Sequence, residues 1–172
     1  MPSKALPCFP PGLSAQANRI VKLLREHSLT VVTAESCTAG LIAALLSKPE
    51  GASDVLHGGF VTYSKVQKSR VLGVLAALLK RDGSVTAKVA SEMASGALRR
   101  SPADIALAVT GVLGPAPDED GNPVGLVYFA CVRRGHKPRA LRRKFVKRDH
   151  DTLCAATIRT AFELLEDVVS SS

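Results

Sequence analysis

The stretch Leu29-Thr-Val-Val-Thr-Ala-Glu-Ser-Cys-Thr-Ala-Gly-Leu-Ile-Ala-Ala-Leu-Leu46 decides how this chain folds. Its first residues, 29–33, form a short β-branched run that is typical of a buried strand, and residues 41–46 predict a helix. The small polar residues between them predict a sharp turn. Such a turn exposes a side chain next to the free N–H groups at the start of the helix.

The remaining sequence continues this alternation of strands and helices. An amphipathic helix is expected from Ser14 onward, and Ser84 occupies the expected N-cap of a helix that has small residues on one face. Further strands are expected over residues 58–63, 105–110, 124–132 and 141–146, and further helices over residues 64–72 and 151–168. This order favours an α/β fold with a mixed sheet in a single domain.

Length and composition agree with one domain. The chain has 172 residues, enough for one core, and its 46% hydrophobic and 22% charged residues exclude an intrinsically disordered chain. No apolar run approaches the roughly 18 residues of a membrane span. Residues 1–12 contain four prolines and lack the apolar core of a signal peptide, so we expect a flexible leader before a domain over residues 13–172.

The four cysteines, Cys8, Cys37, Cys131 and Cys154, are scattered without a C-x-x-C pair. This spacing predicts neither a zinc site nor a disulfide framework, and it fits a reducing compartment. We therefore expect a cytoplasmic protein without a metal site or a cofactor.

The net charge of +8 predicts an anionic partner, which is a nucleic acid, a membrane surface or a phosphorylated small molecule. Most of the excess positive charge lies between Arg133 and Arg148. Alternation along two strands would divide these side chains between two faces, and the chain has no Trp and two Tyr for base stacking. A solvated hairpin with one or two arginines facing a ligand phosphate is favoured over nucleic-acid binding.

The turn after the first strand offers Ser36 and Cys37 as candidate nucleophiles beside an anion-binding helix start, although Ser36 or Thr38 can equally be an ordinary N-cap. A serine needs a base to accept its proton. His57 is the one histidine in a suitable place. The alternative base is Lys68, which lies one helical turn beyond Tyr63 and could complete a Ser-Lys-Tyr relay, unless it is a solvated surface lysine.

A second candidate binding element follows the strand at residues 105–110. Thr110-Gly111-Val112-Leu113-Gly114-Pro115 ends a strand with glycines that let backbone N–H groups approach an anion. The motif matches neither the P-loop nor the dinucleotide fingerprint, so an ordinary tight turn is the competing interpretation.

Taken in order, these segments resemble the C-terminal domain of the competence/damage-inducible CinA family, from about Val31 to Leu165. The segments that carry the resemblance are Ala34-Glu35-Ser36-Cys37-Thr38, Gly59 to Tyr63 with Lys68, Leu72-Gly73-Val74, Val89-Ala90 with Met93-Ala94 and Gly96, Thr110-Gly111 with Gly114-Pro115, and Pro123-Val124-Gly125.

The resemblance implies a three-layer α/β/α sandwich, a homo-oligomer, and nicotinamide mononucleotide deamidase activity that yields nicotinate mononucleotide and ammonia. It assigns the roles of nucleophile, proton relay and general base to Ser36, Tyr63 and Lys68. The partner is then a small nucleotide rather than a membrane or a nucleic acid. The substrate-binding residues expected from the resemblance and the motifs together are Glu35, Cys37, Thr38, Gly40, Thr110, Gly111 and Arg148.

Several positions depart from the family pattern. Ala39 replaces a second glycine, Leu113 replaces an alanine, and the loop over residues 116–122 is less glycine-rich. Before Arg148, Val146 and Lys147 replace a glycine and an aspartate. A catalytically silent domain that binds a nucleotide or mediates assembly is therefore the alternative to the deamidase.

Overall fold

A five-stranded mixed sheet forms the centre of the molecule in the computed structural model, which describes residues 10–146 and 148–171. The strand order is β2-β1-β3-β4-β5. β1 (Val31–Glu35) pairs in parallel with both β2 (Leu56–Val61) and β3 (Ile105–Gly111). β4 (Leu126–Arg133) and β5 (Arg139–Lys144) continue the sheet in antiparallel pairing. The predicted mixed sheet is confirmed.

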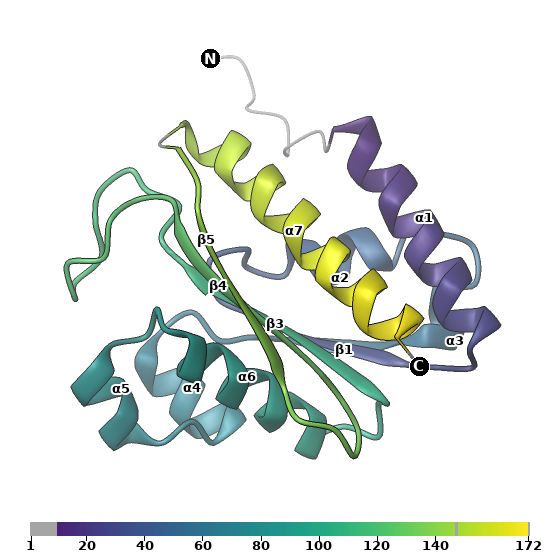
Figure 1. Cartoon of the computed structure of the whole chain (residues 1–172), viewed down its shortest axis with the longest axis horizontal. Helices are drawn as coiled ribbons and strands as arrows, with labels where there is room; N and C mark the ends of the chain where they lie inside the picture. The colour runs from purple at the N-terminus through teal and green to yellow at the C-terminus, as the bar shows by residue number, and fades with distance from the viewer. Residues whose placement is uncertain (1–9, 147, 172) are drawn as a thin grey trace, which may run out of the picture.

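Two groups of helices cover the two faces of the sheet (Figure 1). One face packs against α1 (Pro11–Glu26), α2 (Leu41–Leu46), α3 (Ala52–Val55) and α7 (His150–Ser170), and the other against α4 (Lys65–Leu72), α5 (Ala76–Asp82) and α6 (Ala87–Arg99). Because both faces are covered, β1 is buried along its whole length. The predicted three-layer α/β/α sandwich is confirmed.

The two layers of core differ in side-chain size. Alternate strand residues such as Leu107 and Phe129 belong to the core under α1 and α7, whereas Ala106, Ala108 and Ala130 face α6. Small strand residues let α6 lie close to the sheet. Helix α6 also meets the end of α4, where a Cβ atom at Gly96 would overlap the backbone carbonyl oxygen of Leu72.

Several element boundaries differ from the prediction. Helix α1 begins at Pro11 rather than Ser14, because proline is favoured in the first turn, so residues 11 and 12 of the predicted leader are helical. Residues 1–9 of that leader lie outside the described residues. The predicted N-cap at Ser84 is wrong, since the Thr86 hydroxyl accepts the hydrogen bond from the Val89 N–H (3.1 Å) and caps α6. The short helices α3 and α5 were not predicted.

In the described ranges, no helix combines the length and the apolar character that a membrane crossing requires.

The contact at Gly96 makes a stability prediction. Gly96→Ala is expected to destabilise the protein by about 1–3 kcal/mol, since its methyl group has no room against the α4 backbone. Gly12→Ala is the matched control: it makes the same change in a helix with open space around it, and we expect no loss of stability there. Urea unfolding of both variants measures the difference. Equal stability of the two would contradict the packing described here.

Candidate active site

The carboxylate of Glu35, at the end of β1, organises the turn that follows it. The side chain is 1% exposed and accepts five hydrogen bonds. Two come from the hydroxyls of Thr33 (3.0 Å) and Thr38 (2.7 Å). Three come from backbone N–H groups at the start of α2, which belong to Gly40, Ile42 and Ala43 and lie 2.9–3.0 Å away. Glu35 therefore caps α2 from inside the protein.

The cap fixes the backbone between the strand and the helix. The Ser36 N–H donates to the Val109 carbonyl on β3 (3.0 Å), and the Ser36 carbonyl accepts from the Ala39 N–H (3.0 Å). Ala39 and Gly40 both have positive φ, 49° and 93°. For Ala39, which has a Cβ atom, this conformation costs roughly 1–2 kcal/mol.

Only some backbone N–H groups of the turn are available to donate hydrogen bonds to an oxyanion. The N–H of Ala39 is bonded to Ser36, and that of Gly40 to Glu35. Within the described residues, the N–H groups of Cys37 and Thr38 donate to no oxygen atom, and the Cys37 N–H faces its own thiol. These two groups, directly after Ser36, are therefore the candidate oxyanion donors.

The side chain of Lys68, on α4, reaches Ser36 at the end of β1. Its side chain is 1% exposed, and its Nζ lies 2.8 Å from Ser36 Oγ. The same Nζ donates to the carbonyls of Thr62 (2.9 Å) and Tyr63 (3.2 Å), where β2 leads into α4. A cation buried without a carboxylate partner is disfavoured, and burial lowers the pKa of Lys68 from 10.5 to about 8.

The protonation state of Lys68 decides the direction of its contact with Ser36. The neutral amine keeps two N–H bonds, which the Thr62 and Tyr63 carbonyls accept. Its lone pair then faces the Ser36 hydroxyl, which becomes the donor. This arrangement is that of a serine whose proton has a ready acceptor.

A cavity of about 430 Å³ opens onto Ser36 at the carboxyl ends of the three parallel strands. Such an edge is where ligands bind in open α/β sheets. Ser36, Cys37, Tyr63, Lys65, Thr110, Gly111, Leu113 and Glu119 are among the residues that line it.

The cysteine beside Ser36 is not a comparable nucleophile. Cys37 lines the cavity, but burial raises the pKa of its thiol to about 12, so it stays protonated at neutral pH. His57 lies exposed on β2 and does not line the cavity, which leaves Lys68 as the base in contact with Ser36.

The other predicted site residues occupy different positions. Glu35, Thr38 and Gly40 are joined to one another inside the turn, and Tyr63 is 71% exposed at the cavity rim. Thr110 lines the cavity, although its hydroxyl donates to the Ser84 carbonyl (2.9 Å). Gly111 lines it as well, whereas Arg148 is exposed and lies outside the cavity lining.

Two ion pairs at this site were not predicted from the sequence, those of Lys65 with Glu119 and Asp120. Lys65 Nζ lies 2.7 Å from Asp120 Oδ1 and 2.9 Å from Glu119 Oε1. These pairs join the start of α4 to the loop after β3, and 54 or 55 positions separate the partners. The acidic run at residues 118–120 within a loop, opposite a basic helix, was the available signal.

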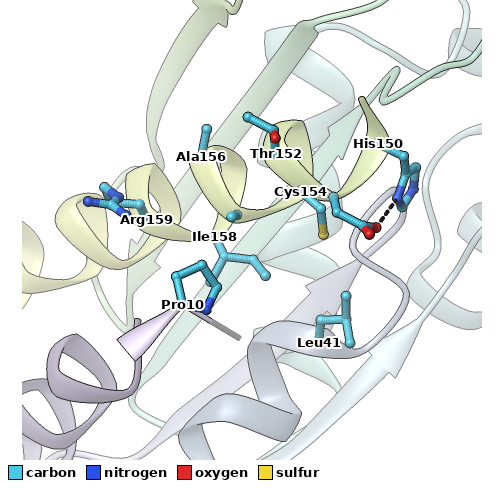
Figure 2. A pocket seen from close by; sticks show the side chains of 10 residues that line it. Pro10, Leu41, His150, Thr152, Cys154, Ala156, Ile158 and Arg159 are labelled. Carbon is cyan, nitrogen blue, oxygen red and sulfur yellow. Dashed lines mark hydrogen bonds and ion pairs between the residues drawn. The ribbon is translucent and has the colours of Figure 1, made fainter. Parts of the chain in front are cut away.

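A second pocket, of about 520 Å³, lies between the first turns of α7 and the starts of α1 and α2 (Figure 2). Cys154 and Ile158 on α7 face Leu41 and Pro10 across it, and His150 stands at one end (Figure 2). Asp151 also lines this pocket. Burial raises the pKa of Cys154 to about 11. None of the described residues that line this pocket is therefore an activated nucleophile, and the cavity at Ser36 is the candidate active site.

Sequence comparison relates the chain to one family. The CinA C-terminal domain family matches residues 13–169. A CinA-like protein of Geobacter sulfurreducens is 47% identical over 115 residues, which cover 67% of this chain and 28% of that protein. A CinA-like protein of a Synechococcus species is 37% identical over 158 residues, or 92% of this chain and 38% of that protein. The chain thus spans less than two fifths of these curated relatives.

Comparison with solved structures indicates the same family. A competence/damage inducible protein from Agrobacterium tumefaciens has a TM-score of 0.89 at 39% identity, over 94% of this chain and 98% of that chain. A CinA superfamily protein from Escherichia coli has a TM-score of 0.86 at 35% identity, over 91% and 90% of the two chains.

The internal cap makes a prediction about the turn. Glu35→Ala leaves five donors without their acceptor, and we expect it to lower the free energy of unfolding by about 3–5 kcal/mol. Glu35→Gln, which keeps one acceptor oxygen, should lose less. Glu163→Ala, an exposed change on α7, should stay within about 0.5 kcal/mol. Urea unfolding followed by circular dichroism gives these values, and a Glu35→Ala loss no larger than that of Glu163→Ala would refute the capping role.

Proposed function

This chain belongs to the CinA C-terminal domain family, and from that premise we propose that it is an amidohydrolase that converts nicotinamide mononucleotide into nicotinate mononucleotide and ammonia. The observation that carries the proposal is the contact of 2.8 Å between the buried Lys68 Nζ and Ser36 Oγ. A buried lysine with a lowered pKa beside a serine, at the floor of a cavity, fits acyl transfer better than passive binding.

The first half of the reaction forms an acyl ester. Ser36 Oγ attacks the carboxamide carbon, which the adjacent pyridinium makes electrophilic, and its proton moves to the Lys68 amine. The oxyanion that forms accepts hydrogen bonds from the N–H groups of Cys37 and Thr38, and each such donor typically contributes about 3 kcal/mol. Lys68 then returns the proton to the departing nitrogen as the C–N bond breaks and ammonia leaves.

The second half hydrolyses the ester. Lys68, neutral again, accepts a proton from water as the water oxygen attacks the acyl carbon, and it gives a proton back to Ser36 as the ester bond breaks. Nicotinate mononucleotide leaves and the free serine is restored. Tyr63, at the cavity rim, assists this proton transfer once substrate covers it, and Gly111 and Thr110 contact the ribose. From the sequence, Thr110, Gly111 and Arg148 were the candidates for holding the ribose phosphate; Thr110 and Gly111 line the cavity, whereas Arg148 is not among its lining residues.

Ammonia release from nicotinamide mononucleotide without added metal tests the function. We expect activity from the unaltered protein and a loss of at least about a thousandfold in kcat for Ser36→Ala and for Lys68→Ala, since nucleophile and base act as a unit. Lys22→Ala, an exposed change on α1, is the control and should keep full activity. Circular dichroism confirms that each variant is folded.

Two results would contradict this proposal. Full activity in Ser36→Ala would contradict the assigned nucleophile. No ammonia from the unaltered protein would reject this reaction, and stabilisation by the nucleotide in a thermal unfolding assay would then favour a silent nucleotide-binding domain.

A further inference from the structure

The charges around the Ser36 cavity present a problem for a phosphorylated substrate. Among the described residues that line the cavity, Lys65 is the one cationic side chain, whereas Asp118 and Glu119 are both acidic. Lys65 is also paired with Glu119 and Asp120, as described above. A nucleotide phosphate that enters this cavity therefore meets one cation, and that cation is already occupied.

Hydrogen bonds within the loop at residues 118–122 fix the acidic partners of Lys65 in position. The Asp118 carboxylate accepts from the N–H groups of Asp120 (3.0 Å) and Asn122 (2.7 Å), which orders the loop. The second oxygen of Asp120 accepts from the Ser84 N–H (3.3 Å). Asp120 thus has a structural partner besides Lys65. The Glu119 side chain is 72% exposed, and its one ion pair among the described residues is with Lys65, so breaking that pair costs little free energy.

Lys65 is well placed to hold one end of a nucleotide whose other end reacts at Ser36. It is the first residue of α4, three positions before Lys68, so the two side chains leave the same helix about one turn apart. Lys68 points inward to Ser36 and Lys65 points to the cavity. Lys65 is protonated while it is paired with the loop, because its hydrogen bonds to Asp120 and Glu119 raise its pKa above the ordinary value.

We infer that Lys65 binds the phosphate group of the nucleotide substrate, and that the Glu119 carboxylate forms an ion pair with Lys65 until the substrate phosphate replaces it. The inference rests on the proposed function. Carboxylate and phosphate both present anionic oxygens to an ammonium group, and phosphate carries more charge. Entry of the substrate therefore exchanges the Glu119–Lys65 ion pair for a phosphate–Lys65 ion pair. Glu119 acts as an internal competitor that lowers affinity for the phosphorylated ligand.

Two substrates that differ by the phosphate alone test this inference. We would measure KM and kcat for nicotinamide mononucleotide and for nicotinamide riboside with the unaltered protein, Lys65→Ala, Glu119→Gln and the control Lys22→Ala. Where the riboside is not hydrolysed measurably, its Ki against the mononucleotide replaces its KM. The ratio of the two constants isolates the phosphate, because any effect of Lys65 on Lys68 acts on both ligands.

The two variants should move this ratio in opposite directions. Lys65→Ala should raise KM for the mononucleotide about 10- to 100-fold and change the riboside constant less than about threefold. Glu119→Gln should lower KM for the mononucleotide several-fold and leave the riboside constant unchanged. Lys22→Ala should match the unaltered protein for both ligands.

The contrary results separate the two proposals. Equal changes for both ligands in Lys65→Ala, or no gain of affinity in Glu119→Gln, would overturn the role of Lys65 while the deamidase stands. No ammonia from the unaltered protein would overturn the proposed function and this inference with it.

Discussion

The site depends on one buried carboxylate, that of Glu35, which forms no ion pair with any described residue. Glu35 is stabilised by five hydrogen-bond donors, of which three are N–H groups at the start of α2. Burial of an ionised carboxylate is costly unless its oxygens are satisfied, so strand, turn and helix must adopt one arrangement together. That arrangement places Ser36 at the end of β1 with its N–H bonded to β3. The fold and the position of the nucleophile are therefore consequences of the same interaction.

The turn joins its neighbours through backbone bonds, and these bring Lys68 to Ser36. The Glu35 carbonyl accepts from the Thr62 N–H (2.8 Å), which ties the end of β1 to the end of β2. The Thr62 and Tyr63 carbonyls then accept from Lys68 Nζ. Three hydrogen-bond partners hold the Lys68 amine in place, but burial removes the bulk water that would solvate an ammonium ion, so the neutral form is favoured. Position and lowered pKa thus arise from the same burial.

The local hydrophobic pattern of the sequence was sufficient to predict the sheet, most of the helices and the turn at Ser36, because strand and helix periodicity are short-range properties. The family resemblance added the partnership of Ser36 with Lys68. Sequence reasoning had no means of finding that Glu35 points inward to α2 rather than to substrate, because both roles suit a carboxylate after a strand. The Lys65 pairs with Glu119 and Asp120 were also missed, because contacts between positions 54 or 55 apart leave no periodic signal. The N-cap of α6 is Thr86 rather than the predicted Ser84. Serine and threonine are both good capping residues, so the sequence alone did not distinguish two positions that lie two residues apart.

The central claim is that neutral Lys68 accepts the proton of Ser36, and the pH dependence of kcat/KM for ammonia release tests it most directly. A lowered lysine pKa means that the active, neutral form increases as pH rises through about 8. We expect kcat/KM to rise with pH, with an apparent pKa near this value, and then to level off. A rate independent of pH between about 6 and 10, or one governed by a single group titrating near 6.5, as an unperturbed histidine does, would contradict it.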